Sequence, residues 1–163
     1  MLEDSAVALR TLLRLGALLY LFYSAVMQVF ASTSRFELEN ILRRRGLDQN
    51  ETAAKRVDRI LDRRDLAVSA GHVLSLLAAS VMAIAAVMLY YAWGVVTAGA
   101  VVLAGEVLVK GAVSSLASLV AYHAGGVLFL LVIPAWPVFK LASLVEKIVD
   151  RLLGRGADVA PPH

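Results

Sequence analysis

Long apolar runs without a single charged residue alternate with one densely charged segment along this chain. The charge-free runs cover residues 15–34, 66–105 and 111–139, with 20, 40 and 29 residues. A helix that crosses a bilayer needs about 20 apolar residues. The first run therefore predicts one span, and the second predicts two spans with a break at 90–94, because aromatic residues favour the membrane surface and Gly94 permits a turn.

The segment 35–64 carries nine of the sixteen basic residues, and its apolar positions predict a helical hairpin. Gly46 is expected to end the first helix, and Asn50 is expected to cap the second. The excess of basic residues places the hairpin in the cytoplasm, with the N-terminus outside and the C-terminus cytoplasmic. Arg10 and Arg14 count against this orientation.

Residues 127–139 are apolar but too few to cross a membrane, and Pro134 and Pro137 interrupt helical hydrogen bonding. They predict a re-entrant or interfacial segment that leads into an amphipathic juxtamembrane helix over about 138–153. A fourth crossing over about 116–139 is the alternative. We expect an all-α polytopic membrane protein with three transmembrane helices, a single domain over 1–154 and a disordered tail over 155–163.

Composition supports membrane insertion and excludes several function classes. The chain is 60% hydrophobic, against roughly 45–50% in soluble domains. The net charge of +3 is weak, and no face interleaves basic and aromatic residues, so no nucleic-acid partner is expected. There is no cysteine and no His-Glu-x-x-His or Gly-x-Ser-x-Gly motif, so we expect no enzyme.

Glu106 is a carboxylate at the end of the longest charge-free run. A carboxylate at membrane depth costs roughly 2.5–3.5 kcal/mol, so such residues usually pair, face a cavity or bind an ion. At about 1.5 Å of rise per residue, Ser24, His72 and Glu106 lie near mid-membrane on three different spans. They predict an ion site, whereas helix packing by Ser24, a hydrogen-bonded buried His72 and a Glu106–Lys110 ion pair are the structural alternatives.

An ordered set of motifs resembles the membrane domain of the CorC/cyclin M magnesium transporters over about residues 12–154. The motifs are Ser24-Ala25, Ser32-Thr33-Ser34-Arg35, Arg63-Arg64-Asp65-Leu66, Gly71, Gly105-Glu106-Val107-Leu108-Val109-Lys110 and Pro134-Ala135-Trp136-Pro137. The resemblance implies a divalent-cation transporter or exchanger that forms a homodimer in the cell membrane. It also implies that Mg²⁺ binds between the spans at Ser24, at the position of His72 or Val73, and at Glu106.

The chain departs from the family pattern at several ligand positions. Met27 replaces a glutamate, His72 and Val73 replace two asparagines, and Val109 replaces a proline. Mg²⁺ prefers oxygen ligands, whereas histidine nitrogen suits Zn²⁺, Co²⁺, Ni²⁺ or Cu²⁺. These departures leave open a shift of selectivity to another divalent cation or a loss of transport.

The family's cytoplasmic nucleotide-binding and transporter-associated domains do not follow residue 154. We expect any regulation to need another polypeptide. The alternative function is a non-transporting membrane subunit that assembles with a full-length relative or with another membrane partner.

Overall fold

The computed structural model describes residues 2–137, 140–141, 144–145 and 148, and every regular element among them is helical. The elements are α1 (Leu2–Ser32), α2 (Arg35–Arg44), α3 (Glu51–Tyr90), α4 (Ala92–Val113), α5 (Ala117–Val132) and the 3₁₀ helix η1 (Ile133–Ala135). By length and composition, α1, α3, α4 and the segment Ala117–Ala135 are apolar enough to cross a membrane. The all-α prediction is confirmed for the described residues.

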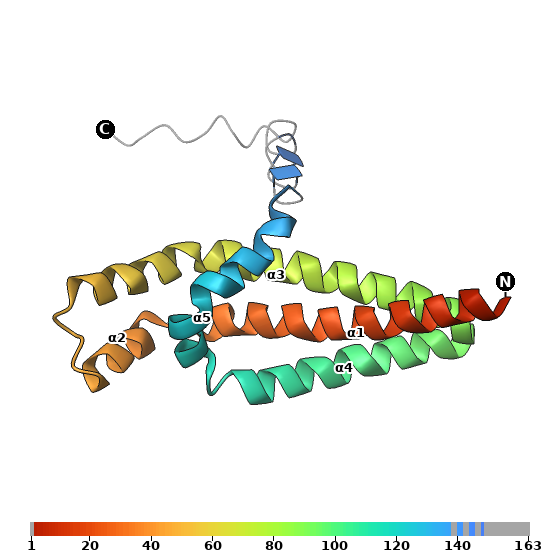
Figure 1. The fold of residues 1–163 in the computed structure, drawn as a ribbon, viewed down its shortest axis with the longest axis horizontal. Helices are drawn as coiled ribbons and strands as arrows, with labels where there is room; N and C mark the ends of the chain where they lie inside the picture. The colour runs from red at the N-terminus through yellow and green to blue at the C-terminus, as the bar shows by residue number, and fades with distance from the viewer. Residues whose placement is uncertain (1, 138–139, 142–143, 146–147, 149–163) are drawn as a thin grey trace, which may run out of the picture.

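The three long helices α1, α3 and α4 lie side by side along the long axis of the molecule (Figure 1). Helices α1 and α3 are antiparallel, since Gly16 lies against Met82 and Gly71 lies against Met27. A Cβ atom added at either glycine would lie 3.1 Å from the facing methionine Cβ. Small residues at these positions let the two backbones approach closely, as is typical of helix pairs in membranes.

The predicted ends of the charged helices are confirmed. Gly46 follows α2 with a φ of +66°, the left-handed conformation that commonly ends helices. The Asn50 side chain accepts hydrogen bonds from the backbone amides of Thr52 at 2.9 Å and Ala53 at 3.2 Å. However, the second hairpin helix does not end before the predicted span, because α3 continues from Glu51 to Tyr90 as one helix of 40 residues.

The chain reverses direction between α3 and α4 within the predicted region 90–94. Tyr91 has a φ of +50° and a ψ of −126°, a backbone conformation that residues other than glycine rarely adopt. Gly94 instead lets the start of α4 lie close to α3, because a Cβ atom there would lie only 2.2 Å from the Ala86 carbonyl oxygen. The predicted break is therefore in the right place, although Gly94 contributes packing and Tyr91 contributes the unusual backbone angle.

Helix α5 corrects the predicted boundary at residue 127. The helix begins at Ala117 and continues through Gly125 and Gly126, and Pro134 then lies in η1. Gly125 packs against Ile60, with a Cβ position 3.6 Å from the isoleucine side chain. Only residues 140–141, 144–145 and 148 of the predicted amphipathic helix are described, and the predicted tail 155–163 lies outside the described residues.

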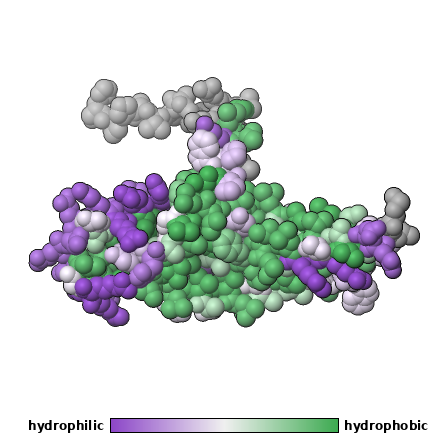
Figure 2. Space-filling view, in the orientation of Figure 1, coloured by the Kyte–Doolittle hydropathy of each residue, from purple (hydrophilic) through white to green (hydrophobic). Residues whose placement is uncertain are grey.

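The surface separates into apolar and polar zones along the long axis. Figure 2 shows apolar side chains over the middle of the molecule, a large polar group at the end formed by α2, and a smaller polar group near the N-terminus. Ile84, Leu103 and Val107 in the apolar zone are 62%, 70% and 73% exposed. A contiguous apolar surface of this kind is typical of contact with a membrane or another protein.

Arg64 of α3 forms hydrogen bonds with backbone carbonyl groups at the C-terminal end of α1. Its guanidinium donates hydrogen bonds to the carbonyl oxygens of Phe30 at 3.1 Å and Ala31 at 2.9 Å. These carbonyls belong to the last turn of α1, where helical partners are lacking and a positive charge is favourable.

We expect Arg64→Gln to lower the free energy of unfolding by about 1.5–3 kcal/mol, the usual contribution of hydrogen bonds from a charged group. Unfolding of the purified protein in detergent micelles, followed by circular dichroism, measures the change. Arg44→Gln removes an exposed arginine of α2 and is expected to change stability by less than about 0.5 kcal/mol. Equal losses in the two variants would contradict the role assigned to Arg64.

Candidate functional site

Glu106 reaches the bundle interior because its neighbour lets α4 approach α1. Gly105 is buried, and a Cβ atom there would lie 2.8 Å from a methyl carbon of Leu21 and 3.0 Å from the Tyr20 ring. The lack of a side chain at Gly105 thus creates the close contact between the helices. The half-buried Glu106 side chain extends from the next position along α4 to α1.

Two hydroxyl groups of α1 donate to the Glu106 carboxylate. The Tyr20 hydroxyl lies 3.0 Å from Oε1, and the Ser24 hydroxyl lies 3.1 Å from the same oxygen. Tyr20 also lies 3.3 Å from the Val102 carbonyl oxygen, so that two acceptors share its single proton. Tyr20 and Ser24 are 3% and 1% exposed, which places the hydroxyls inside the helix packing. Hydrogen bonds to an ionised acceptor are the stronger kind, and they stabilise a carboxylate away from water.

The predicted alternative of a Glu106–Lys110 ion pair is not what the structure contains. The ion pairs with described partners are Arg35–Glu39, Arg35–Asp58 and Glu51–Lys55. Lys110 is exposed, and Glu106 Oε2 accepts no hydrogen bond from the described residues. Among the described residues, the hydrogen-bond partners of the carboxylate are therefore Tyr20 and Ser24, and both act on Oε1.

The structure brings together two of the three predicted site residues. Ser24 and Glu106 form a direct hydrogen bond, whereas the His72 side chain is exposed and forms no hydrogen bond with either residue. Ser75 is buried at 4% exposure on the same helix, and its hydroxyl donates to the His72 carbonyl oxygen at 2.8 Å. The imidazole is consequently not a ligand of this Ser24–Glu106 site in the observed arrangement.

Sequence reasoning missed Tyr20 as a partner of Glu106. Tyr20 lies four residues before Ser24, and residues at this spacing share one face of a helix. A tyrosine is usually assigned to the membrane surface, where its hydroxyl reaches water. The i,i+4 relation to a predicted site residue was the signal that could have identified it.

The oxygen atoms at the site determine which ions it can bind. Within the described residues, no group of three or more His, Cys, Asp or Glu side chains lies close enough to hold a metal ion. Glu106, Ser24 and Tyr20 nevertheless offer one carboxylate and two hydroxyl oxygens in one place. Mg²⁺ commonly binds through one or two carboxylates and keeps several waters. The donor set suits a partly hydrated hard cation better than a fully dehydrated one.

Comparison of the chain with protein-family models, curated proteins and solved structures finds no match. The resemblance to the CorC/cyclin M transporters therefore stays a prediction from the motifs. Function has to be argued from the geometry and chemistry of the site, because a fold class alone does not determine function.

We expect His72→Ala to leave divalent-cation binding unchanged and to alter the free energy of unfolding by less than about 0.5 kcal/mol. The reason is that an exposed side chain without contacts to the site contributes little to either quantity. Calorimetric titration of the purified protein with Mg²⁺ and Zn²⁺ measures the binding. A loss of Zn²⁺ binding in this variant would show that His72 turns inward to the site.

Proposed function

We propose that this chain is a membrane domain that binds and transports divalent cations, with Glu106 as the ion-binding carboxylate. The single observation that carries the proposal is the paired donation of Tyr20 and Ser24 to one oxygen of Glu106, with the second oxygen left without a described partner. A carboxylate in an apolar bundle is costly, so such residues usually pair with a charge, face a cavity or bind an ion. Here the described residues supply hydroxyl groups but no cation.

Mg²⁺ is the favoured ion because every donor at the Ser24–Glu106 site is a hard oxygen. Nitrogen-preferring metals would need the imidazole of His72, which is exposed and apart from Glu106. The proposal keeps Ser24 and Glu106 of the predicted ligands and adds Tyr20. It treats the CorC/cyclin M resemblance as support for the class of ion and for a homodimer, with water in place of the ligand that the resemblance implies at His72 or Val73.

The membrane arrangement that we propose has three crossings, by α1, α3 and α4, with α2 and the start of α3 on the cytoplasmic side and the N-terminus outside. The concentration of basic residues in 35–64 supports this orientation. The segment Ala117–Ala135 is long and apolar enough to cross, but α5 packs in its middle part along the charged part of α3: Gly125 contacts Ile60, and Phe129 lies under Arg63. This packing favours an interfacial α5 over a fourth crossing beside the apolar part of α3.

Uptake by liposomes tests transport directly. Liposomes that carry the purified protein are compared with protein-free liposomes for uptake of Mg²⁺, Mn²⁺, Co²⁺ and Zn²⁺, with an internal fluorescent indicator for each ion. Saturable, protein-dependent Mg²⁺ uptake is the expected result. Uptake no faster than in protein-free liposomes for all four ions would overturn the proposal.

The second candidate is a non-transporting membrane subunit of a larger transporter. It is favoured by the single carboxylate at the site and by the methionine at position 27, where the resembling family has a second one. Co-purification of a membrane partner, together with no metal binding by the chain alone, is the expected result for this function. Self-assembled protein that moves ions in liposomes would contradict it.

A further inference from the structure

Three arginines and three aspartates lie on different faces of the first part of α3. At about 100° per residue, Arg56, Arg59 and Arg63 fall within an arc of about 60°. Asp58, Asp62 and Asp65 fall on another face of the same helix. None of the three arginines forms an ion pair with a described residue. Their charge is thus not neutralised by the neighbouring carboxylates of α3.

The arginine face of α3 looks toward α5 and borders a small cavity of about 140 Å³. Arg56 lies over the Tyr122 ring at 5.2 Å from its centroid, and Arg63 lies over the Phe129 ring at 4.8 Å. Arg59 and Gly126 also line this cavity. The aromatic rings hold the guanidinium planes in place, while their hydrogen-bond donors have no carboxylate partner.

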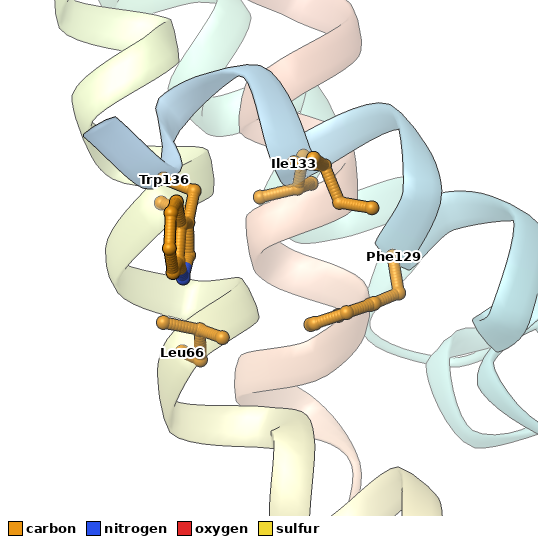
Figure 3. A pocket seen from close by; sticks show the side chains of 6 residues that line it. Leu66, Phe129, Ile133 and Trp136 are labelled. Carbon is orange, nitrogen blue, oxygen red and sulfur yellow. The ribbon is translucent and has the colours of Figure 1, made fainter. Parts of the chain in front are cut away.

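An apolar cavity of about 360 Å³ adjoins the basic one and shares Phe129 with it. It is lined by Leu66, Ala70, Phe129, Val132, Ile133 and Trp136. Figure 3 shows the labelled side chains of Leu66 and Trp136 on one side of this cavity and those of Phe129 and Ile133 on the other. Lys140 lies over the Trp136 ring at 4.4 Å and adds a further positive charge beside it.

The basic cavity and then the apolar cavity follow one another along α3, in the same order as the headgroup and the acyl chains of a phospholipid. Arg56, Arg59 and Arg63 come first, and Leu66 and Ala70 follow at the start of the charge-free run. An anionic headgroup fits the first cavity, and part of an acyl chain fits the second. Basic residues beside a membrane helix attract anionic lipids, and the aromatic rings are of the kind found at the membrane surface.

We propose that the groove between α3 and α5 binds one anionic phospholipid, with its phosphate on Arg59 and Arg63 and an acyl chain against Trp136. The charge complementarity selects an anionic over a zwitterionic lipid. The inference rests on the membrane placement proposed above but not on Glu106. Loss of lipid selectivity and loss of cation binding are consequently separate outcomes.

Fluorescence quenching of Trp136 tests the proposal. The chain has two tryptophans, and Trp93→Phe leaves Trp136 as the only reporter. The protein is reconstituted in phosphatidylcholine vesicles that contain either phosphatidylglycerol or phosphatidylcholine with brominated acyl chains, which quench tryptophan on contact. We expect half-maximal quenching at a roughly tenfold lower mole fraction of the brominated anionic lipid, the scale that one or two basic residues provide.

Matched variants separate the groove from diffuse charge attraction. Arg59→Gln with Arg63→Gln is expected to abolish the tenfold preference, whereas Arg43→Gln with Arg44→Gln removes equal charge from α2 and is expected to keep it. Gly126→Leu fills the basic cavity without changing charge, at a helical position with no atom within 4 Å of the added Cβ. This variant is expected to lower the preference severalfold even if the arginine variant does not fold.

Three outcomes would overturn the proposal. Equal quenching by the two lipids in the protein with its arginines intact would mean that the groove binds an acyl chain without selecting the headgroup. No quenching by either lipid would mean that protein covers Trp136. Equal loss of preference in the α2 variant and in the Arg59/Arg63 variant would mean that the whole basic surface attracts lipid and that the groove does not.

Discussion

Glu106→Gln is expected to weaken Mg²⁺ binding by more than about 100-fold and to stop protein-dependent uptake. Glutamine has the same shape as glutamate and can still accept hydrogen bonds from Tyr20 and Ser24 through its carbonyl oxygen. It lacks the negative charge that a divalent cation needs. Residues that only support a metal ligand already contribute about 10–100-fold to affinity, so loss of the charged ligand itself should cost more. Calorimetric titration of the purified protein measures the affinity.

The stability of the same variant distinguishes an ion-binding role from a structural one. A neutral amide costs less than a carboxylate in an apolar bundle, so the free energy of unfolding should stay unchanged or rise. Glu39→Gln serves as the control, because Glu39 is an exposed carboxylate on α2 that pairs with Arg35. Unchanged Mg²⁺ affinity in Glu106→Gln would refute the site, and a large loss of stability would assign Glu106 a structural role.

The sequence predicted the end of α2 and the start of α3 correctly because local chemistry determines them. Gly46 ends α2 and Asn50 caps α3 through contacts within a few residues. The predicted boundary near Leu66 is different, since α3 continues there without interruption. At this position the side chains change from charged to apolar, so the surroundings of the helix surface change. The backbone hydrogen bonds of the helix do not depend on those surroundings, and the helix continues.

The preferred start of the α5 segment at residue 127 was wrong, whereas the alternative segment over about 116–139 begins where α5 begins. Gly125 and Gly126 directly precede residue 127, and glycine is a poor helix former. In the structure, Gly125 lies against Ile60 of α3 and permits the two helices to pack closely. This tertiary contact outweighs the low helix preference of glycine, and the contact with Ile60 cannot be read from residues 117–132 alone.

The sequence predicted the heights of the candidate site residues along the helices, but it did not predict how α3 is rotated about its own axis. Counting residues places Ser24, His72 and Glu106 at similar heights, yet each residue turns a helix by about 100°. The face of α3 that meets α1 is determined by Gly71 against Met27, and His72 is the next residue around the helix. His72 therefore points outward, while Ser75 is buried. The rotation of α3 depends on packing with α1, which lies far away in the sequence.

Gly94→Ala is expected to lower the free energy of unfolding by about 3 kcal/mol, at the upper end of the usual cost of overpacking. The added Cβ would lie 2.2 Å from the Ala86 carbonyl oxygen, 2.4 Å from its carbon and 2.6 Å from the Val87 nitrogen. All three are backbone atoms of α3, which cannot move aside as the end of a flexible side chain can. The start of α4 would have to move away from α3.

Gly99→Ala is the matched control for this prediction, because it adds the same methyl group to the same helix. No atom lies within 4 Å of the added Cβ at Gly99. Alanine is a better helix former than glycine, so this variant should gain about 0.5–1 kcal/mol. Unfolding in detergent micelles, followed by circular dichroism, compares the two variants. If both gained stability, the close contact of α3 and α4 at the Tyr91 turn would be refuted; opposite signs would support it, because composition and helix propensity are altered identically.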